Sequence, residues 1–297
     1  MKRIDKNRAI FSMDKNNKAV DIIESGEVLI FETSDCYNGQ LKSEDMFLHN
    51  ADFEFTNPAT GPVFVKDAEV GDALKISILD ISVNQYGIMS VAPKYGVPGD
   101  EIESNKTKII NIENNLAKFD DEIEIKIEPM IGVIGTAPLN DPIGNVIPDY
   151  HGGNMDCKKI VKDSIVILPV NVKGGLLAIG DLHAVMADGE VCGCGLEIAG
   201  EVKVKIEIIK NTELPLPMII DKNSVMCLSS KETLDEAAIE ATNNMHSLII
   251  KYLNKTPAEA SMLLSLVGNL GICQIVDPLK TARMEFPRKF IDIENLF

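Results

Sequence analysis

A series of Val- and Ile-rich segments is spread over the first 210 residues of the chain. Four of them have the composition of β-strands: residues 27–33, 73–83, 164–170 and 202–210. Several alternate apolar and polar residues with period two, as Lys203 and Lys205 alternate with valines in the last segment. This alternation is typical of strands with one buried face. The series predicts a β-rich body, built as a sandwich or a barrel-like sheet.

Helical signals appear late in the chain. Thr233 and Glu236 have the spacing of a capping box before an apolar face at helical spacing. Thr256 and Glu259 repeat that spacing with a proline at the first helical position, and Gly268 or Gly271 would end this second helix. Two late amphipathic helices are therefore expected.

These patterns together predict a mainly β protein of the α+β class. The β-rich body would span residues 1–210 and a smaller α/β part residues 211–297. No stretch has the composition of a flexible linker, so residues 1–297 are expected to form a single compact unit.

Charge and composition exclude several classes of function. The 297 residues include 29 Lys+Arg and 45 Asp+Glu, which gives a net charge of −16. So acidic a chain is unsuited to nucleic acid or anionic membranes. No apolar run reaches the length of a membrane span, and no signal peptide follows the N-terminal basic residues. With 6 cysteines in 297 residues and no C-x-x-C pair, the thiols are expected to be reduced. We expect a soluble, cytoplasmic protein.

A glycine-rich segment carries the first candidate site. In Tyr150–Asp156 (YHGGNMD), His151 is followed by Gly152, Gly153, Asn154 and Asp156. Glycines let a backbone approach a ligand closely, and imidazole and carboxylate groups are common ligands of divalent metals. The alternative is a loop whose glycines serve turns only.

A second segment adds ionisable groups beside apolar residues. Asp181 and His183 are two residues apart, as are Asp188 and Glu190, so in an extended chain each pair would point the same way. Buried among apolar residues, such groups need partners, a metal or water. An exposed hairpin with solvated charges is the alternative. Asp35, at the end of the first strong strand, is a further candidate, although an ordinary turn would also place an Asp there.

These motifs make the sequence resemble the acetamidase/formamidase family. The resemblance covers most of the chain, in order, and its most specific part is the combination of HGGNMD with GDLHAVMADGE. The segments that carry it are NPATGP (57–62), GVIG (132–135), HGGNMD (151–156), GDLHA (180–184), DGEV (188–191), LLS (263–265), VDP (276–278) and TAR (281–283). The family implies a β-rich fold, a bound divalent metal, and hydrolysis of the C–N bond of small linear amides to carboxylate and ammonia.

The chemistry of amide hydrolysis gives each candidate residue a role, and which carboxylate binds metal and which moves the proton stays open. Asp35, His151, Asp156 and His183 are the expected metal ligands, with zinc favoured where histidine takes part and calcium or magnesium at an oxygen-only subsite. Glu190 is the expected proton shuttle for metal-assisted attack of water, with Asp188 as the next carboxylate to consider. Backbone amides of Gly152 and Gly153 would donate to the oxyanion, and Asn154 would bind substrate.

Two other mechanisms stay open. Cys157 or Cys192, with Glu190 and Lys158, would form a Cys-nucleophile amidase. A non-catalytic relative would bind a small amide-like or carboxylate ligand. The expected substrate is a neutral linear amide such as formamide or acetamide, and the expected assembly is a homodimer.

Overall fold

Two large mixed sheets form most of the molecule in the computed structural model, which describes residues 1–297 apart from the side chain of Asn295. The first sheet has nine strands, in the order β1 (Lys2–Ile4), β5 (Val28–Thr33), β18 (Gly200–Ile209), β7 (Ala73–Val83), β15 (Ile165–Pro169), β19 (Met218–Ile220), β20 (Ser224–Lys231), β22 (Lys280–Pro287) and β21 (Asn269–Gln274). β1 runs parallel to β5, and the other neighbouring strands are antiparallel. Strands expected near residues 27–33, 73–83, 164–170 and 202–210 are confirmed as β5, β7, β15 and β18.

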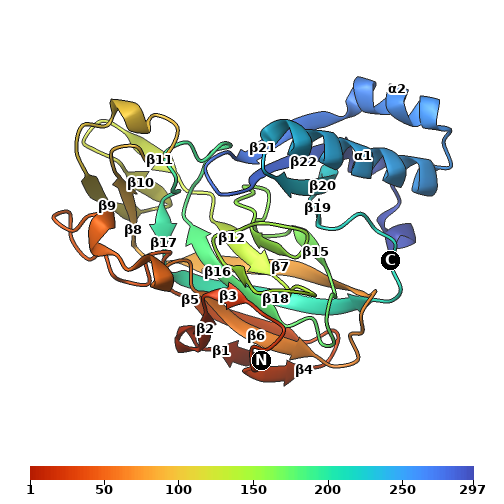
Figure 1. Cartoon of the computed structure of the whole chain (residues 1–297), viewed down its shortest axis with the longest axis horizontal. Coiled ribbons are helices and arrows are strands. Elements are labelled where there is room, and N and C mark those ends of the chain that lie inside the picture. The colour runs from red at the N-terminus through yellow and green to blue at the C-terminus, as the bar shows by residue number, and fades with distance from the viewer.

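The second sheet has eleven strands. Its main path is β11 (Glu124–Lys126), β10 (Leu116–Lys118), β9 (Lys106–Glu113), β8 (Tyr86–Val91), β17 (Glu197–Ile198), β16 (Leu177–His183), β12 (Met130–Gly135) and β14 (Gly152–Asn154). Beside this path, β6 (Ala59–Val65) pairs with β16, β2 (Ala9–Ile10) and β4 (Asp21–Ile23). A separate small sheet joins β13 (Ile143–Gly144) to β3 (Ser12–Met13). In Figure 1, β8 to β11 lie at one end of the molecule and the helices at the other.

The main hydrophobic core lies between the two sheets. Phe31, Ile76 and Val204 of the nine-stranded sheet and Ile131 and Ile179 of the other are fully buried in one cluster. The strand orders are open, so the described strands form no closed barrel. The predicted β-rich body with two late helices is thus confirmed, and its sheets are mixed.

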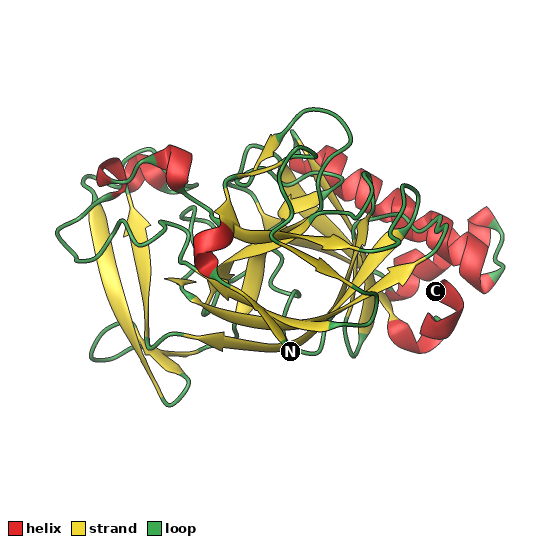
Figure 2. Cartoon of the chain, turned by 90° about the horizontal axis from the view of Figure 1, so that it is seen from below, coloured by secondary structure: helices red, strands yellow, loops and turns green.

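Both late helices begin at the expected capping boxes, and the second ends at the expected Gly268. α1 (Leu234–Leu253) starts at the Thr233–Glu236 capping box, and α2 (Pro257–Val267) starts at Thr256 and ends at Gly268. The apolar face of α1 buries Ala241, Met245 and Leu248, among others, in a second core that includes residues of β19, β20 and β22. Figure 2 shows both helices at one side of the strands.

Strands from both halves of the chain share the nine-stranded sheet. β19, which belongs to the α-containing part, pairs with β15 of the body through Ile165–Ile220 and Ile167–Met218. This continuity supports the single unit expected from the sequence, which stays a prediction. No helix in the described part of the chain has the length and apolarity to cross a membrane.

Candidate active site

The candidate active site forms where β16, β17 and β14 meet loops from distant parts of the chain. β16 pairs with β17 so that His183 lies directly opposite Glu197. His183 Nε2 is 3.1 Å from Glu197 Oε1, 3.6 Å from Asp181 Oδ1 and 3.8 Å from Asp156 Oδ1. All four side chains are buried. One imidazole therefore lies among three carboxyl groups.

Two groups of these side chains have the spacing of metal ligands. Asp156, His183 and Glu190 form one group, and Cys36, Asp181 and Glu197 form the other; within each group the ligand atoms lie within 4.8 Å of one another. In the described structure Asp156 Oδ1, Asp181 Oδ1, Glu197 Oε2 and His183 Nδ1 are buried without a hydrogen-bond partner. Because uncompensated buried carboxylates are costly, this donor set fits a divalent cation.

The backbone brings three of the carboxylates inward through an unusual conformation. Asp156, Asp181 and Glu190 have φ values of 41°, 54° and 47°, in the left-handed region that few non-glycine residues adopt. Such conformations cost of order 1–3 kcal/mol and concentrate at functional sites. The same conformation also occurs in ordinary turns, for example at Asp67 and Lys94, so the burial and contacts of these three side chains, and not the conformation alone, mark the site.

Burial and mutual repulsion shift the titration of the acidic groups. Burial, with the charges of Glu190 and Asp277, raises the pKa of Asp156 well above its usual range, and burial does the same for Glu190. It also raises the pKa of Glu197 and of Asp277 to about 7. For His183, burial alone would lower the pKa, but Glu197 and Asp181 outweigh it and raise the pKa well above its usual range. The site therefore favours protons or a cation among its carboxylates.

A cavity of about 270 Å³ opens onto this cluster. Its polar part is lined by Asn57, Asn154, Asp181, Glu190, Glu197 and Asp277. Asn154 donates from Nδ2 to Asp277 Oδ2 at 3.0 Å, and its Oδ1 has no partner. Leu48, Phe53 and Pro278 are among the apolar lining residues, and no Lys or Arg is among the described residues that line the cavity. The cavity is rich in hydrogen-bond acceptors.

Two of the four expected metal ligands, Asp156 and His183, are brought together. Asp35 and His151 belong to neither group of described ligand atoms. Asp35 Oδ1 accepts from the amide of Gly39 at 3.1 Å, as in an ordinary turn. His151 is fully buried with both ring nitrogens unpartnered, and burial lowers its pKa to about 4. It is therefore neutral at pH 7.

Of the three residues expected at the substrate, Asn154 lines the cavity. The amide of Gly152 donates to the carbonyl of Asp149 at 3.0 Å, so it is not free for an oxyanion. A Cβ on Gly152 would lie 2.4 Å from the carbonyl oxygen of Ile134, and one on Gly153 would lie 2.5 Å from that of Ile147. Both glycines thus allow close packing of backbones.

Glu190 and Asp188 lie in different surroundings. Glu190 lines the cavity, whereas Asp188 is bound by Arg283 and by Lys158, with an Nζ–Oδ2 distance of 3.0 Å to the lysine. Burial would raise the pKa of Asp188, but the hydrogen bonds from Arg283 and Lys158 outweigh it and lower the pKa. The geometry favours Glu190 over Asp188 as the group that reaches a substrate.

Gly132 on β12 gives a direct test of the carboxylate arrangement. A Cβ there would lie 2.4 Å from Asp156 Oδ1 and 2.5 Å from Asp181 Oδ2. Gly132→Ala is therefore expected to displace both carboxylates, to lower the free energy of unfolding by about 1–3 kcal/mol and to reduce bound metal. Elemental analysis and urea unfolding measure these effects.

Gly144→Ala is the matched control, because nothing lies within 4 Å of a Cβ at that position. Equal metal content in the Gly132→Ala and Gly144→Ala proteins would contradict the arrangement described above.

Comparison with known proteins identifies the family of this chain. The model of the acetamidase/formamidase family matches residues 13–145 and 140–277. A relative from Schizosaccharomyces pombe that bears a formamidase name is 28% identical over 250 residues. That alignment covers 64% of this chain and 61% of the relative, so the chain spans about three fifths of the relative's length.

Solved structures match over nearly the whole chain. The acetamidase from Bacillus halodurans is 44% identical, with a TM-score of 0.96 and 99% of each chain covered. The acetamidase from Yersinia enterocolitica is 27% identical, with a TM-score of 0.93, covering 98% of this chain and 93% of its own. Since the family model covers well over half of the sequence, the chain belongs to the acetamidase/formamidase family.

Proposed function

We propose that this protein hydrolyses the C–N bond of small linear amides to a carboxylic acid and ammonia. The observation that carries the proposal is the acceptor-rich cavity whose wall includes Asp181 and Glu197, the two carboxylates nearest to His183. The carboxamide of a primary amide presents two N–H donors, for which Asn154 Oδ1 and the carboxylates are suitable acceptors. Relatives bearing formamidase and acetamidase names support the same reaction.

The buried carboxylates and His183 would hold a divalent cation. We propose Asp156 and His183 as ligands, with Asp181 and Glu197 in place of the Asp35 and His151 expected from the sequence. Zinc is favoured because an imidazole takes part, and calcium or magnesium would suit the oxygen-rich side. A cation held there would supply Lewis acidity to the amide carbonyl and to the attacking water.

Glu190 is proposed as the proton shuttle. It lies within reach of Asp156 and His183 and lines the cavity, so it can take a proton from water and pass it to the leaving nitrogen. Asn154 would orient the carboxamide through its free Oδ1, while its Nδ2 holds Asp277 at the cavity wall.

The charge of the cavity supports a neutral substrate. Asp181, Glu190, Glu197 and Asp277 line it, and no described Lys or Arg does, so an anionic group would be repelled. Formamide and acetamide, the substrates suggested by the sequence, satisfy this condition.

A Cys-nucleophile mechanism has weaker support. Cys36 lines the cavity, but burial, together with the nearby charges of Glu197 and Asp181, raises the pKa of its thiol well above the usual range. Cys157 is fully buried, and Lys158, its proposed partner, is bound to Asp188. The Cys36 thiol is therefore a poor nucleophile. Burial would raise the pKa of Cys157, but the hydrogen bond with Cys273 and the charge of Arg283 outweigh it and lower the pKa. The hydrogen bond with Cys194 lowers the pKa of Cys192 to about 6. Neither Cys157 nor Cys192 is among the described residues that line the cavity.

Removal of metal tests the function and the mechanism together. Protein purified without chelator is expected to contain a divalent metal, and dialysis against a strong chelator should abolish release of ammonia from acetamide until metal is restored. Full activity in a metal-free sample would overturn the metal-assisted mechanism and favour a cysteine nucleophile. Ligand binding without turnover in the metal-loaded protein would identify a non-catalytic binding protein.

The expected homodimer is measured in the same preparation by light scattering.

A further inference from the structure

The loop that carries Glu190 is fixed to the C-terminal part of the chain. The amide of Gly189 donates to the carbonyl of Cys273 at 2.8 Å, and the amide of Ile275 donates to the carbonyl of Gly189 at 3.2 Å. Gly189 thereby forms a parallel bridge with Gln274, at the end of β21. The position of Glu190 in the cavity consequently depends on strands far away in the sequence.

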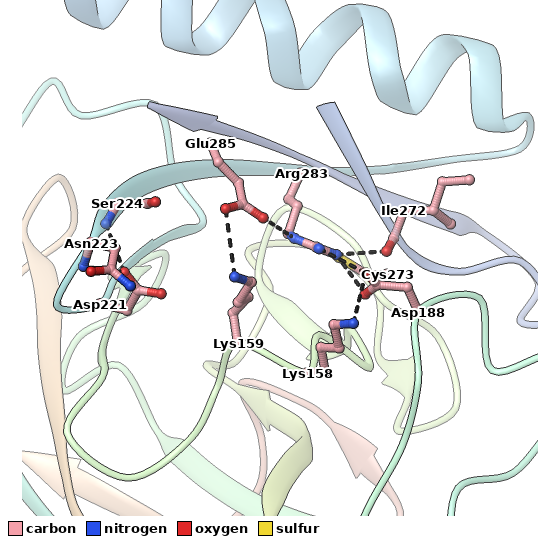
Figure 3. A network of polar contacts seen from close by, with 10 residues as sticks. All are labelled: Lys158, Lys159, Asp188, Asp221, Asn223, Ser224, Ile272, Cys273, Arg283 and Glu285. Carbon is pink, nitrogen blue, oxygen red and sulfur yellow. Dashed lines mark hydrogen bonds and ion pairs between the residues drawn. The ribbon is translucent and has the colours of Figure 1, made fainter. Parts of the chain in front are cut away.

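A buried arginine makes the strongest of these connections. Arg283, on β22, is 4% exposed. Its Nη1 and Nη2 donate to Asp188 Oδ1 and Oδ2 at 2.8 and 2.9 Å, so the guanidinium holds both oxygens of one carboxylate. Figure 3 shows this pair, with Lys158 approaching the same carboxylate. Paired donors of this kind fix orientation as well as distance.

The rest of the guanidinium is also held. Nη1 donates to the carbonyl of Ile272 at 2.6 Å, and Nε donates to Glu285 Oε1 at 2.8 Å (Figure 3). A Cβ on Gly271 of the neighbouring strand would lie 2.7 Å from Arg283 Cζ, so the guanidinium packs closely against the backbone of β21. Arg283 is therefore a rigid anchor for Asp188.

Only a tight turn separates this anchor from Glu190. The amide of Glu190 lies 3.3 Å from the carbonyl of Ala187, and the intervening Gly189 has a φ of 98°. The amide of Gly193 donates to the carbonyl of Glu190 at 2.8 Å and closes the next turn. A displacement of Asp188 would therefore be transmitted to Glu190.

We propose that Arg283 is a positioning residue, which holds Glu190 at the reacting atoms by fixing Asp188. This inference rests on the proposed function, in which Glu190 moves the proton. The two carboxylates that the sequence suggested for proton transfer therefore have different roles. Glu190 faces the cavity, and Asp188 connects the loop that carries Glu190 to β22. The same C-terminal segment also supplies Asp277 to the cavity wall.

Kinetic comparison of paired variants tests the proposal. Arg283→Gln and Asp188→Ala are each expected to lower kcat roughly 10–100-fold with KM changed by less than about 3-fold, because a misplacement of about 1 Å costs on the order of 10²-fold. Arg283→Lys should recover part of the loss. The double variant should be no slower than the worse single variant, because each change removes the same Arg283–Asp188 ion pair.

Glu285→Gln is the matched control. It removes the other carboxylate that Arg283 contacts and leaves the Asp188 pair intact, so kcat should stay near that of the wild type. A loss in Glu285→Gln equal to that in Arg283→Gln, additive losses in the double variant, or a wild-type kcat in Arg283→Gln would each overturn the proposal. If Arg283→Gln does not fold, Asp188→Ala removes the same pair from its more exposed side and decides the question.

Hydrogen exchange separates failure of this inference from failure of the proposed function. Amides in residues 187–193 should exchange faster in Arg283→Gln and Asp188→Ala than in Glu285→Gln, whether or not the protein turns over an amide. Absence of amide hydrolysis by the wild type would refute the function alone. Unchanged exchange in residues 187–193 would refute the anchoring role of Arg283.

Discussion

Replacing Glu190 with glutamine is expected to lower kcat by roughly 10²–10⁴-fold, the usual contribution of general acid–base catalysis. Glutamine has the shape of glutamate, so the buried turn that carries residue 190 should keep its fold, but the amide cannot accept a proton. Ammonia release from acetamide measures kcat. Circular dichroism and elemental analysis establish that fold and metal content are retained.

Glu103→Gln is a suitable control for this variant, because it makes the same chemical change at an exposed position. Wild-type turnover in Glu190→Gln would remove Glu190 from the mechanism. Asp277 would then be the next carboxylate to test, since it lines the cavity while Asp188 is occupied by Arg283 and Lys158.

Local patterns in the sequence were sufficient to predict four of the strands and both late helices. The capping boxes at Thr233 and Thr256 act within one helical turn, so their effect does not depend on the rest of the fold. Strand alternation in β7 and β18 likewise reflects one buried face of each strand. The open arrangement of the two sheets was not predictable in the same way, because it depends on pairing between distant strands.

The same rule of alternation succeeded at one part of the site and failed at another. Asp181 and His183 are on β16, two residues apart, and their side chains meet at 3.6 Å as predicted. Asp188 and Glu190 are also two apart, but they lie outside the strands, in a turn where the amide of Glu190 faces the carbonyl of Ala187. Alternation does not hold in a turn, and so the two carboxylates diverge.

Two residues of the site were missed because their roles depend on long-range contacts. Glu197 faces His183 through the register of β16 and β17, and Asp277 meets Asn154 across 123 residues of sequence. The sequence does contain a signal for Glu197, because it is a charged residue between the apolar Leu196 and Ile198. All three residues are buried in the structure. A single sequence shows such a residue but not its partner.

His183→Ala should remove metal and activity together. His183 Nε2 lies within 4 Å of Glu197, Asp181 and Asp156, so its loss leaves three buried carboxylates without their nearest nitrogen ligand. Because loss of residues that merely support a ligand costs 10–100-fold in metal affinity, loss of a ligand should cost at least about 100-fold. Elemental analysis after dialysis and a competition titration with a metal-sensitive dye measure this effect.

His246→Ala is the matched control for that experiment. His246 lies on α1, where its Nε2 contacts the carbonyl of Pro257 and the hydroxyl of Ser261, away from the carboxylate cluster. The His246→Ala protein should keep its full metal content. His183→Asn, which retains a hydrogen-bonding side chain, serves as a second variant if alanine leaves the buried cluster too unstable to fold. Full metal content and full activity in a folded His183 variant would contradict the assignment of His183 as a ligand. Asp181 and Glu197, which line the cavity, would then be the ligands to test next.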